Sequence, residues 1–345
     1  MHVNIVLLNI NFKFMRLAIV GATGLVGRQI IDVIIERDFF FSELILVASD
    51  KSVGKKIELK NKTFFIYSAA EMLEMKPDLA LFSAGSEVSK ELAPMLNAIG
   101  CKVIDNSSFW RMNKKYKLII PEINGEKLSS KDMIISNPNC STIQLLVVLA
   151  PIHKKYNIER VVVSTYQSVS GSGKKAINQL DDEEKGKTGD MAYPYPIYRN
   201  AIPHIDFFEE NGYTREEMKI INETHKILDS NIQITTTAVR IPVDGGHSES
   251  VNILLSNEFE IEKIKNEISN IVGVTLKDDI EKSIYPMPLF SKGLDDVFVG
   301  RIRRDFSQSK SLNMWIVSDN LRKGAATNTV QIAEYLVEHN LIKTY

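Results

Sequence analysis

The stretch Arg16–Ile30, RLAIVGATGLVGRQI, determines how the rest of the chain is interpreted. A short apolar run ends at Gly21, and glycines recur at Gly24 and Gly27 before a helical pattern begins. Glycines between a strand and a helix let the backbone approach a pyrophosphate, and the helix N-terminus supplies N–H donors and a positive dipole. The spacing differs from the usual G-x-G-x-x-G, so a tight turn without a ligand is the alternative. We favour nucleotide binding because both flanking elements are present.

Downstream of this unit, short apolar runs alternate with helical patterns. Leu44–Ala48, Leu79–Ser83 and Lys102–Ile104 are predicted to be buried strands, and 86–99 is predicted to be a helix. This alternation is typical of a parallel, doubly wound sheet. The N-terminal part is therefore predicted to be a Rossmann-type α/β domain.

The pattern changes after Pro151. Arg160–Tyr166, Asn231–Val243 and Ser250–Leu255 are longer and rich in Val, Ile and Thr, which predicts a mixed or antiparallel sheet in a second, α+β domain. Residues 181–203 are charged and then rich in Pro and Tyr, so we expect an excursion from the core. An amphipathic helix is predicted over about 325–340.

Composition excludes several classes of partner. Among 345 residues, 42 are Lys or Arg and 43 are Asp or Glu, so no overall positive field attracts nucleic acid or anionic membrane. No run of 18 apolar residues predicts a transmembrane helix. Two cysteines are too few for a disulfide framework, which favours a reducing, cytoplasmic location. Residues 1–14 are apolar and are interpreted as an upstream extension rather than a signal peptide, with Met15 as the functional start.

The end of the second predicted strand bears on cofactor choice. Ser49-Asp50-Lys51-Ser52 lies there, roughly 20 residues after the glycine turn. An acidic residue at this place holds a ribose 2′-hydroxyl, as in NAD, whereas Lys51 with Ser52 holds a 2′-phosphate, as in NADP. Both residue types are present, so the preference stays open, with NADP favoured.

Two further motifs point to cysteine chemistry. Asn139 is a good N-cap for an apolar helix, and Cys140 falls in its first turn, where free N–H groups and the dipole are expected to lower the thiol pKa. Cys101 leads into a core strand and is expected to be inert. Gly245 and Gly246 precede His247, which suggests close approach of a ligand. No cluster has metal-ligand spacing, so no metal is predicted.

Taken in order, these motifs resemble the aspartate-semialdehyde dehydrogenase family. The resemblance covers about Arg16 to the C-terminus and rests on GATGLVG (21–27), SAG (83–85), DNSSFWR (105–111), NPNCST (137–142), STYQSVSGSG (164–173), NETHKI (222–227), VRIPVDGGHS (239–248) and DNLRKGAA (319–326). It implies NADPH-dependent reduction of L-aspartyl-4-phosphate to the semialdehyde and phosphate through a cysteine thioester. The product would serve the diaminopimelate route to lysine, and threonine, methionine and isoleucine synthesis.

The resemblance also implies residue roles. Cys140 would be the nucleophile, His247 the acid/base and Gln167 the group that orients the substrate. Arg111 and Lys226 would hold the phosphate, Glu223 the ammonium and Arg240 the carboxylate. The implied contacts to NADP(H) are Gly21, Thr23, Gly24, Leu25, Val26, Gly27, Lys51, Ser52, Ser83, Gly85, Ser170, Gly171 and Asn320.

The implied organisation has two domains. Residues 15–138 and 321–345 would form the NADP-binding domain, and 139–320 the catalytic and dimerisation domain. Members of the family form homodimers, some of which pair into tetramers. N-acetyl-γ-glutamyl-phosphate reductase is the close alternative. The amine of its substrate is blocked, however, so that enzyme would not need Glu223 as a counter-charge. A catalytically inactive, nucleotide-binding relative is the other alternative, and it should have lost Cys140, Gln167 or His247, all of which are present.

Overall fold

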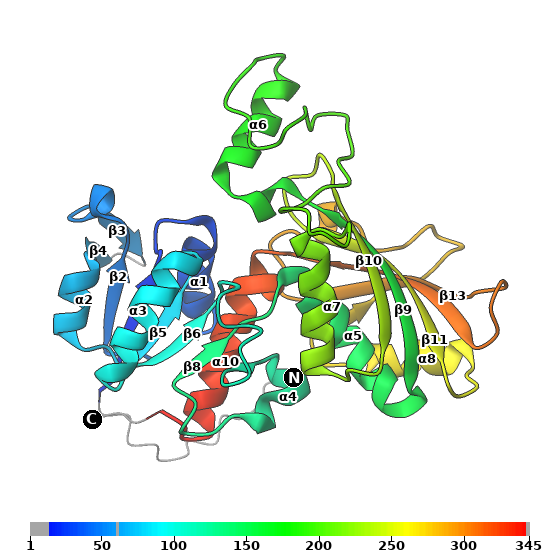
Figure 1. Ribbon diagram of the computed structural model, residues 1–345, viewed down its shortest axis with the longest axis horizontal. Coiled ribbons are helices and arrows are strands. Elements are labelled where there is room, and N and C mark those ends of the chain that lie inside the picture. The colour runs from blue at the N-terminus through cyan, green and yellow to red at the C-terminus, as the bar shows by residue number, and fades with distance from the viewer. Residues whose placement is uncertain (1–13, 60–61, 343–345) are drawn as a thin grey trace.

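The computed structural model describes residues 14–59 and 62–342, and it contains two sheets that lie side by side (Figure 1). The first sheet has the strand order β3-β4-β2-β1-β5-β6-β8-β7. Its strands are β1 (Arg16–Val20), β2 (Glu43–Val47), β3 (Lys56–Leu59), β4 (Lys62–Tyr67), β5 (Leu79–Phe82), β6 (Lys102–Asp105), β7 (Lys117–Leu118) and β8 (Ile134–Ser136). All neighbouring pairs are parallel except β3 and β4. The predicted doubly wound domain is confirmed, with an antiparallel edge strand that was not predicted.

Both faces of this sheet are buried, because successive side chains of each strand point to opposite sides. Leu17 and Ile19 belong to one apolar cluster, and Ala18 and Val20 to the other. The helices of this domain are α1 (Leu25–Glu36), α2 (Ala69–Met75), α3 (Ser86–Ala98), α4 (Pro121–Asn124) and α10 (Thr327–Glu338), with short 3₁₀ turns η1 (Asp50–Ser52) and η2 (Gly125–Lys127).

The C-terminal helix returns to the first sheet, as the resemblance implied. α10 contacts α1, α4 and β6, and its apolar side chains join the cluster that contains Leu17. A π-helical segment, η4 (Arg322–Ala326), connects it to the second sheet. The predicted extension, 1–14, lies outside the described residues apart from Phe14. Met15 is fully buried, and its backbone N–H donates to Ser42 Oγ.

The second sheet is mixed, with the order β10-β9-β11-β14-β13-β12. Parallel pairs lie at both edges and antiparallel pairs in the middle. Its strands are β9 (Ile158–Gln167), β10 (Gln233–Arg240), β11 (His247–Leu255), β12 (Val274–Leu276), β13 (Val297–Arg304) and β14 (Ser311–Ser318). α5 (Cys140–Tyr156), α7 (Arg215–Ile227) and α8 (Ile261–Ser269) pack against it around a large apolar cluster, and the short α9 (Pro288–Ser291) contacts β14.

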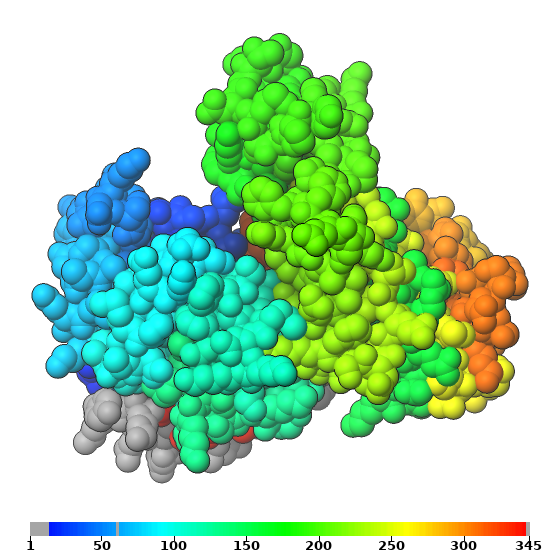
Figure 2. Space-filling view, in the orientation of Figure 1, coloured from blue at the N-terminus to red at the C-terminus, as the bar shows by residue number. Residues whose placement is uncertain are grey.

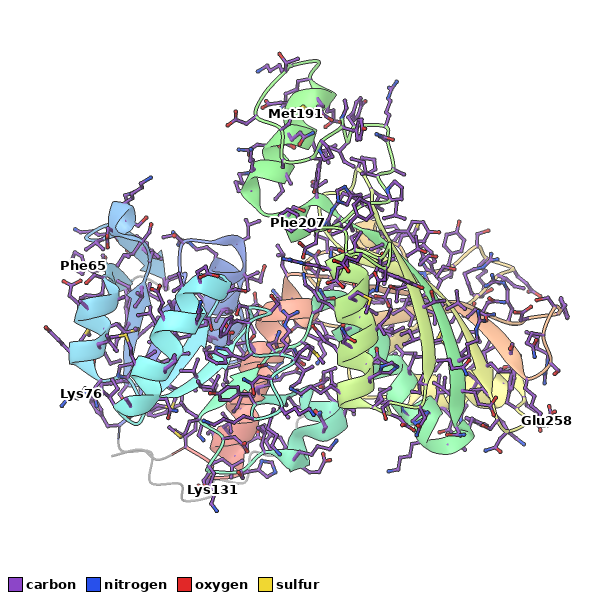
Figure 3. All side chains as sticks on the ribbon, viewed as in Figure 1. Phe65, Lys76, Lys131, Met191, Phe207 and Glu258 are labelled. Carbon is purple, nitrogen blue, oxygen red and sulfur yellow. The ribbon has the colours of Figure 1, made fainter. Side chains whose placement is uncertain are left out.

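The predicted excursion is a lobe that projects from the body of the molecule (Figure 1). It contains η3 (Val169–Ser172), α6 (Lys174–Glu184) and a long coil, and it has a small apolar cluster of its own. Met191 and Phe207 are exposed on it (Figure 3). The lobe therefore overhangs the space between the two domains.

Candidate functional site

A pocket of about 590 Å³ opens between the two domains, below the lobe. Figure 2 shows the surface hollowed between the blue N-terminal domain and the overhanging green segment. Its wall brings together residues that were predicted from separate motifs: Thr23, Gly24, Leu25, Val26, Ser83, Arg111, Cys140, Ser170, Gly171 and Asn320. Asn106, Pro138, Asn139, Gly173, Lys174, Leu321, Gly324 and Ala325 complete the lining.

The glycine turn has the geometry that a nucleotide requires. Gly21 has φ of +91°, and a Cβ there would lie 2.7 Å from the carbonyl oxygen of Ser83. A Cβ on Gly27 would lie 2.1 Å from the carbonyl oxygen of Gly21. Gly24 is the N-cap of α1 and provides no side-chain cap, so the first N–H groups of the helix face the pocket uncapped.

The remaining predicted cofactor residues lie outside the pocket lining. Gly85 is the N-cap of α3 with φ of 87°. Lys51 and Ser52 form η1 together with Asp50, directly after β2. The predicted position of Lys51 and Ser52 after the second strand is therefore confirmed, while the choice between NAD and NADP stays open.

Cys140 is the first residue of α5, as predicted. The Asn139 side-chain oxygen accepts hydrogen bonds from the backbone N–H groups of Ser141 (2.9 Å) and Thr142 (3.3 Å). Those two amides are therefore occupied by the cap. Among the described residues, the amide of Cys140 itself has no partner and is free to face a ligand.

The expected low pKa of Cys140 is wrong for the unliganded site. Burial, followed by the charge of the Glu216 carboxylate, raises the pKa of this thiol to about 12. Arg111, Arg240 and the Ser141 amide act in the opposite direction but do not compensate. The helix terminus is favourable, but removal from water disfavours the thiolate more. The thiol is therefore protonated before substrate binds. The pKa of Cys101 is also raised by burial, which agrees with an inert thiol.

His247 is fully buried, and its ring is oriented by the backbone. Its Nδ1 accepts a hydrogen bond from the Ser168 N–H at 3.1 Å, so the neutral ring carries its proton on Nε2. Nε2 has no partner among the described residues and lies 3.2 Å from the place where a Gly171 Cβ would be. Burial, followed by the charge of Arg240, lowers the pKa of His247 to about 3. The imidazole is therefore a neutral Nε2–H donor beside the pocket wall.

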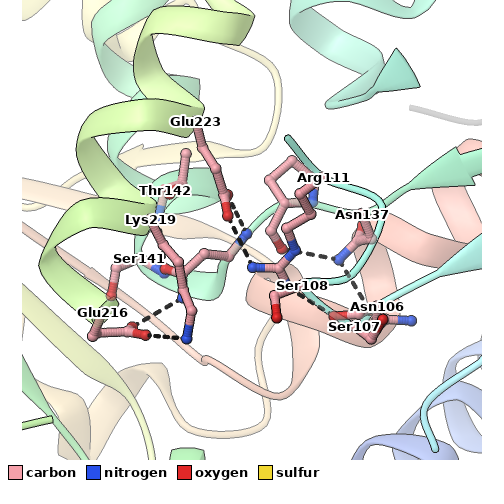
Figure 4. A network of polar contacts seen from close by, with 12 residues as sticks. Asn106, Ser107, Ser108, Arg111, Asn137, Ser141, Thr142, Glu216, Lys219 and Glu223 are labelled. Carbon is pink, nitrogen blue, oxygen red and sulfur yellow. Dashed lines mark hydrogen bonds and ion pairs between the residues drawn. The ribbon is translucent and has the colours of Figure 1, made fainter. Parts of the chain in front are cut away.

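Gln167 belongs to a buried polar network behind Cys140. Its Nε2 lies 3.2 Å from Ser141 Oγ and 3.1 Å from Glu216 Oε1. Glu216 also accepts from the Asn139 amide at 2.9 Å and pairs with Lys219 at 3.2 Å (Figure 4). Burial raises the pKa of Glu216, but Lys219, the two amides and Arg240 outweigh it and lower the pKa to about 2. A charged carboxylate therefore lies next to Cys140.

The side chains of Glu223 and Lys226 bind other groups of the protein. Glu223 pairs with Arg111 at 3.0 Å and accepts from the Asn139 backbone N–H at 2.6 Å (Figure 4). The Lys226 ammonium donates to the carbonyl oxygens of Arg111, Asn113 and Tyr116. Its three protons are thereby satisfied by backbone. The predicted roles of Glu223 for the ammonium and of Lys226 for the phosphate find no support in these contacts.

The spacing of charges along α7 explains why the sequence misled here. Glu216 and Lys219 are three residues apart, as are Glu223 and Lys226, and the two pairs are seven residues apart. Seven residues are about two helical turns, so both pairs lie on the same side of the helix. The sequence cannot distinguish them, whereas their partners in the fold do. Glu216 and Lys219 were missed for this reason.

The two predicted arginines keep part of their hydrogen-bonding capacity. Arg111 donates to Glu223 and to the carbonyl oxygen of Asn106, and Arg240 donates to that of Ser168. The Nε of each is buried without a partner among the described residues. Asn320 accepts from Ser168, Ser170 and the Gly246 N–H, which holds the segments around His247 together.

Gly324 is a further residue without an assigned role in the sequence interpretation. A Cβ at this position would lie 2.8 Å from the Cβ of Cys140. The absence of a side chain therefore lets η4 lie directly against Cys140.

Neither a metal-binding cluster nor a membrane-spanning helix occurs among the described residues, 14–59 and 62–342. They hold no group of three His, Cys, Asp or Glu side chains suited to a metal. None of their helices combines the length and apolarity needed to cross a membrane.

Comparison with known families agrees with the geometry. The family model "Semialdehyde dehydrogenase, NAD binding domain" matches residues 16–131, and "Semialdehyde dehydrogenase, dimerisation domain" matches residues 149–323. The second match supports a homodimer and covers the mixed sheet.

Individual relatives match along nearly the whole chain. Aspartate-semialdehyde dehydrogenase of Aquifex aeolicus is 49% identical, over 95% of this chain and 99% of its own. That of Bacillus subtilis is 44% identical, over 95% and 99% respectively. The structure of aspartate semialdehyde dehydrogenase II from Vibrio cholerae, complexed with ASA, superimposes with a TM-score of 0.90 at 41% identity, covering 94% of this chain and 98% of its own. The chain is therefore an oxidoreductase that belongs to the aspartate-semialdehyde dehydrogenase family.

Proposed function

We propose that this enzyme reduces L-aspartyl-4-phosphate to L-aspartate 4-semialdehyde and phosphate with NADPH, through a thioester on Cys140. The observation that carries the proposal is one pocket lined by the glycine turn, by Cys140 and by Arg111. The names of the relatives support the substrate class. The Vibrio cholerae structure is described as a complex with ASA, which supports binding of the product in the equivalent pocket.

The buried charges match the groups on this substrate, which carries a phosphate, a carboxylate and an ammonium. Arg111 is assigned to the phosphate because it lines the pocket. Arg240, with an unpartnered Nε near His247, suits the planar carboxylate. We assign the ammonium to Glu216, which bonds to Gln167 and Asn139, and we assign Lys219 as the second cation. Glu223 then acts indirectly, by holding Arg111 and the backbone before Cys140.

The first chemical step balances without an external base. The Cys140 sulfur forms a bond to the acyl carbon, the bond to the phosphate oxygen breaks, and the thiol proton leaves with the phosphate as hydrogen phosphate. A protonated resting thiol is compatible with this step because the leaving group accepts the proton. Proton transfer to His247 Nε2 is disfavoured, because that nitrogen already carries a proton in the neutral tautomer.

His247 then serves as a hydrogen-bond donor. Its Nε2–H and the Cys140 amide stabilise negative charge on the acyl oxygen. Bound NADPH supplies the hydride that reduces the thioester carbonyl. When the carbon–sulfur bond breaks, the Cys140 thiolate is released; the His247 Nε2–H stabilises it by a hydrogen bond, and the thiolate regains its proton from water. The neutral tautomer therefore supports a role of His247 as a hydrogen-bond donor rather than as the base that takes the thiol proton.

The proposed cofactor preference, pathways, location and oligomeric state all depend on this reaction. Lys51 and Ser52 at the end of β2 favour the 2′-phosphate of NADP. The semialdehyde would serve the synthesis of lysine through diaminopimelate, and of threonine, methionine and isoleucine. We propose a cytoplasmic homodimer, with pairing of dimers into tetramers as a question for solution measurements.

Phosphate-dependent reduction of NADP⁺ by aspartate semialdehyde tests the proposal. The N-acetylglutamate analogue should be inactive beside it, because Glu216 needs a free ammonium. Cys140→Ala should abolish turnover and retain nucleotide binding, whereas Cys101→Ala should be silent. Mass spectrometry without reductant should find the aspartyl adduct on the Cys140 peptide. Normal turnover by Cys140→Ala, or an adduct on Cys101 alone, would overturn the mechanism.

A further inference from the structure

A fully buried carboxyl group lies behind the candidate active site and is not used by the mechanism above. Glu249 is on β11, a central strand, where its cross-strand neighbours are Thr165 and Ile316. Neither carboxyl oxygen has a hydrogen-bond partner among the described residues. An unpaired charge at such a place is strongly unfavourable, so the group is expected to be neutral.

The surroundings of Glu249 are uncharged. Thr165, Ile316 and Gln144 face it from β9, β14 and α5. Besides Cys140 and His247, these elements and β11 carry the titratable groups Glu159, Arg160, Tyr166, His153, Lys154, Lys155 and Tyr156. None of these groups contributes to the pKa shift of Glu249. Burial raises the pKa of Glu249 well above its usual range. The Gln144 amide is close enough to oppose that rise, although no hydrogen bond between the two closes in this structure. Glu249 therefore carries a proton that it can donate.

Gln144 is the complementary group. It is fully buried, lies one helical turn after Cys140, and its Oε1 also has no partner among the described residues. Its Nε2 lies 3.5 Å from the carbonyl oxygen of His247. Glu249 and His247 are two residues apart on one strand, so their side chains share the sheet face that α5 covers. An acid proton and an orphaned amide oxygen thus face each other in the core.

We propose that Glu249 is a positioning residue for the reaction. Its O–H donates to Gln144 Oε1, and Gln144 Nε2–H donates to the His247 carbonyl oxygen. This chain of two hydrogen bonds fixes the first turn of α5, and with it Cys140, relative to the strand that carries His247. The inference depends on the proposed function only for its activity readout.

Two single variants test whether Glu249 acts as a hydrogen-bond donor. Glu249→Gln keeps the shape and an N–H donor, so kcat should stay within about threefold of the parent enzyme. Glu249→Leu removes the donor, and kcat should fall about 10- to 100-fold with little change in KM for the cofactor, because the nucleophile is displaced. Equal kcat values for the two variants would overturn the proposal.

A double variant separates positioning from stability. Glu249→Leu combined with Gln144→Leu removes both orphaned groups, so the protein should fold with undiminished Tm, yet kcat should remain low. This variant also keeps the test informative if Glu249→Leu alone does not fold. Parental kcat in the stable double variant would show that the pair has no positioning role.

Two readouts are independent of the substrate. The rate at which iodoacetamide alkylates Cys140 should change in Glu249→Leu and stay parental in Glu249→Gln. Because Glu249 is protonated when folded and ionised when unfolded, the stability of the parent should fall relative to Glu249→Gln as pH rises above about 4.5. The ratio of their unfolding constants should grow up to about tenfold per pH unit. A ratio that is flat between about pH 5 and 8 would overturn the proton assignment, even if the enzyme reduced a different acyl phosphate.

Discussion

Gly324→Ala tests how closely η4 must approach the nucleophile. The added Cβ would lie 2.8 Å from Cys140 Cβ and 3.3 Å from Cys140 Cα. Carbon atoms pack best at about 3.5–4.0 Å, so the two segments must separate by about 0.7–1.2 Å. A displacement of about 1 Å in an active site lowers the rate about 100-fold, or about 2.7 kcal/mol in the barrier.

Neither segment can move easily. On the η4 side, Arg322 pairs with Glu36 and Asp295, and Lys323 donates to Glu122. On the α5 side, the Asn139 cap holds the first turn. We therefore expect kcat to fall about 100-fold and stability to fall by about 1–3 kcal/mol from overpacking.

Steady-state kinetics with aspartate semialdehyde, phosphate and NADP⁺, together with thermal unfolding, measure both effects. Gly245→Ala is the matched control, because its Cβ would meet only the flexible Lys292 side chain at 3.4 Å or more. If Gly324→Ala kept parental kcat and Tm, the steric reasoning would be refuted.

Four further substitutions test the site. Lys51→Ala should raise the Kd for NADP more than that for NAD, measured by titration, because only NADP carries the 2′-phosphate; equal losses would contradict the assignment. Lys219→Met should lower kcat/KM strongly, whereas Lys226→Met should mainly lower Tm, because Lys226 holds three backbone carbonyls; a larger loss of kcat/KM in Lys226→Met than in Lys219→Met would restore the assignment of Lys226 to the phosphate. His247 has a folded pKa of about 3, below its unfolded value, so the folded state binds fewer protons. The free energy of unfolding should therefore fall as pH drops below about 6.5, and His247→Asn should flatten that dependence in denaturant titrations at several pH values.

Part of the fold follows from patterns among residues that are close together in the sequence. RLAIV (16–20) is β1 at the predicted bounds, because a run buried on both faces needs apolar residues at every position. The Asn139 cap and the start of α5 at Cys140 were also predictable, since capping depends on neighbours in sequence. The edge strand β3 was not predicted, because an edge strand needs no continuous apolar run.

The sequence by itself therefore determined the domain types, the family and the place of Cys140 at the start of a helix. Only the tertiary structure distinguished the two charged pairs on α7, because pairs seven residues apart have the same helical phase and differ only in their partners. It also reversed the expected pKa of Cys140, since burial comes from segments distant in sequence and outweighs the helix terminus. The contact of Gly324 with Cys140 and the burial of Glu249 near Gln144 likewise arise only where η4, α5 and β11 meet, because contact and desolvation depend on distance in space.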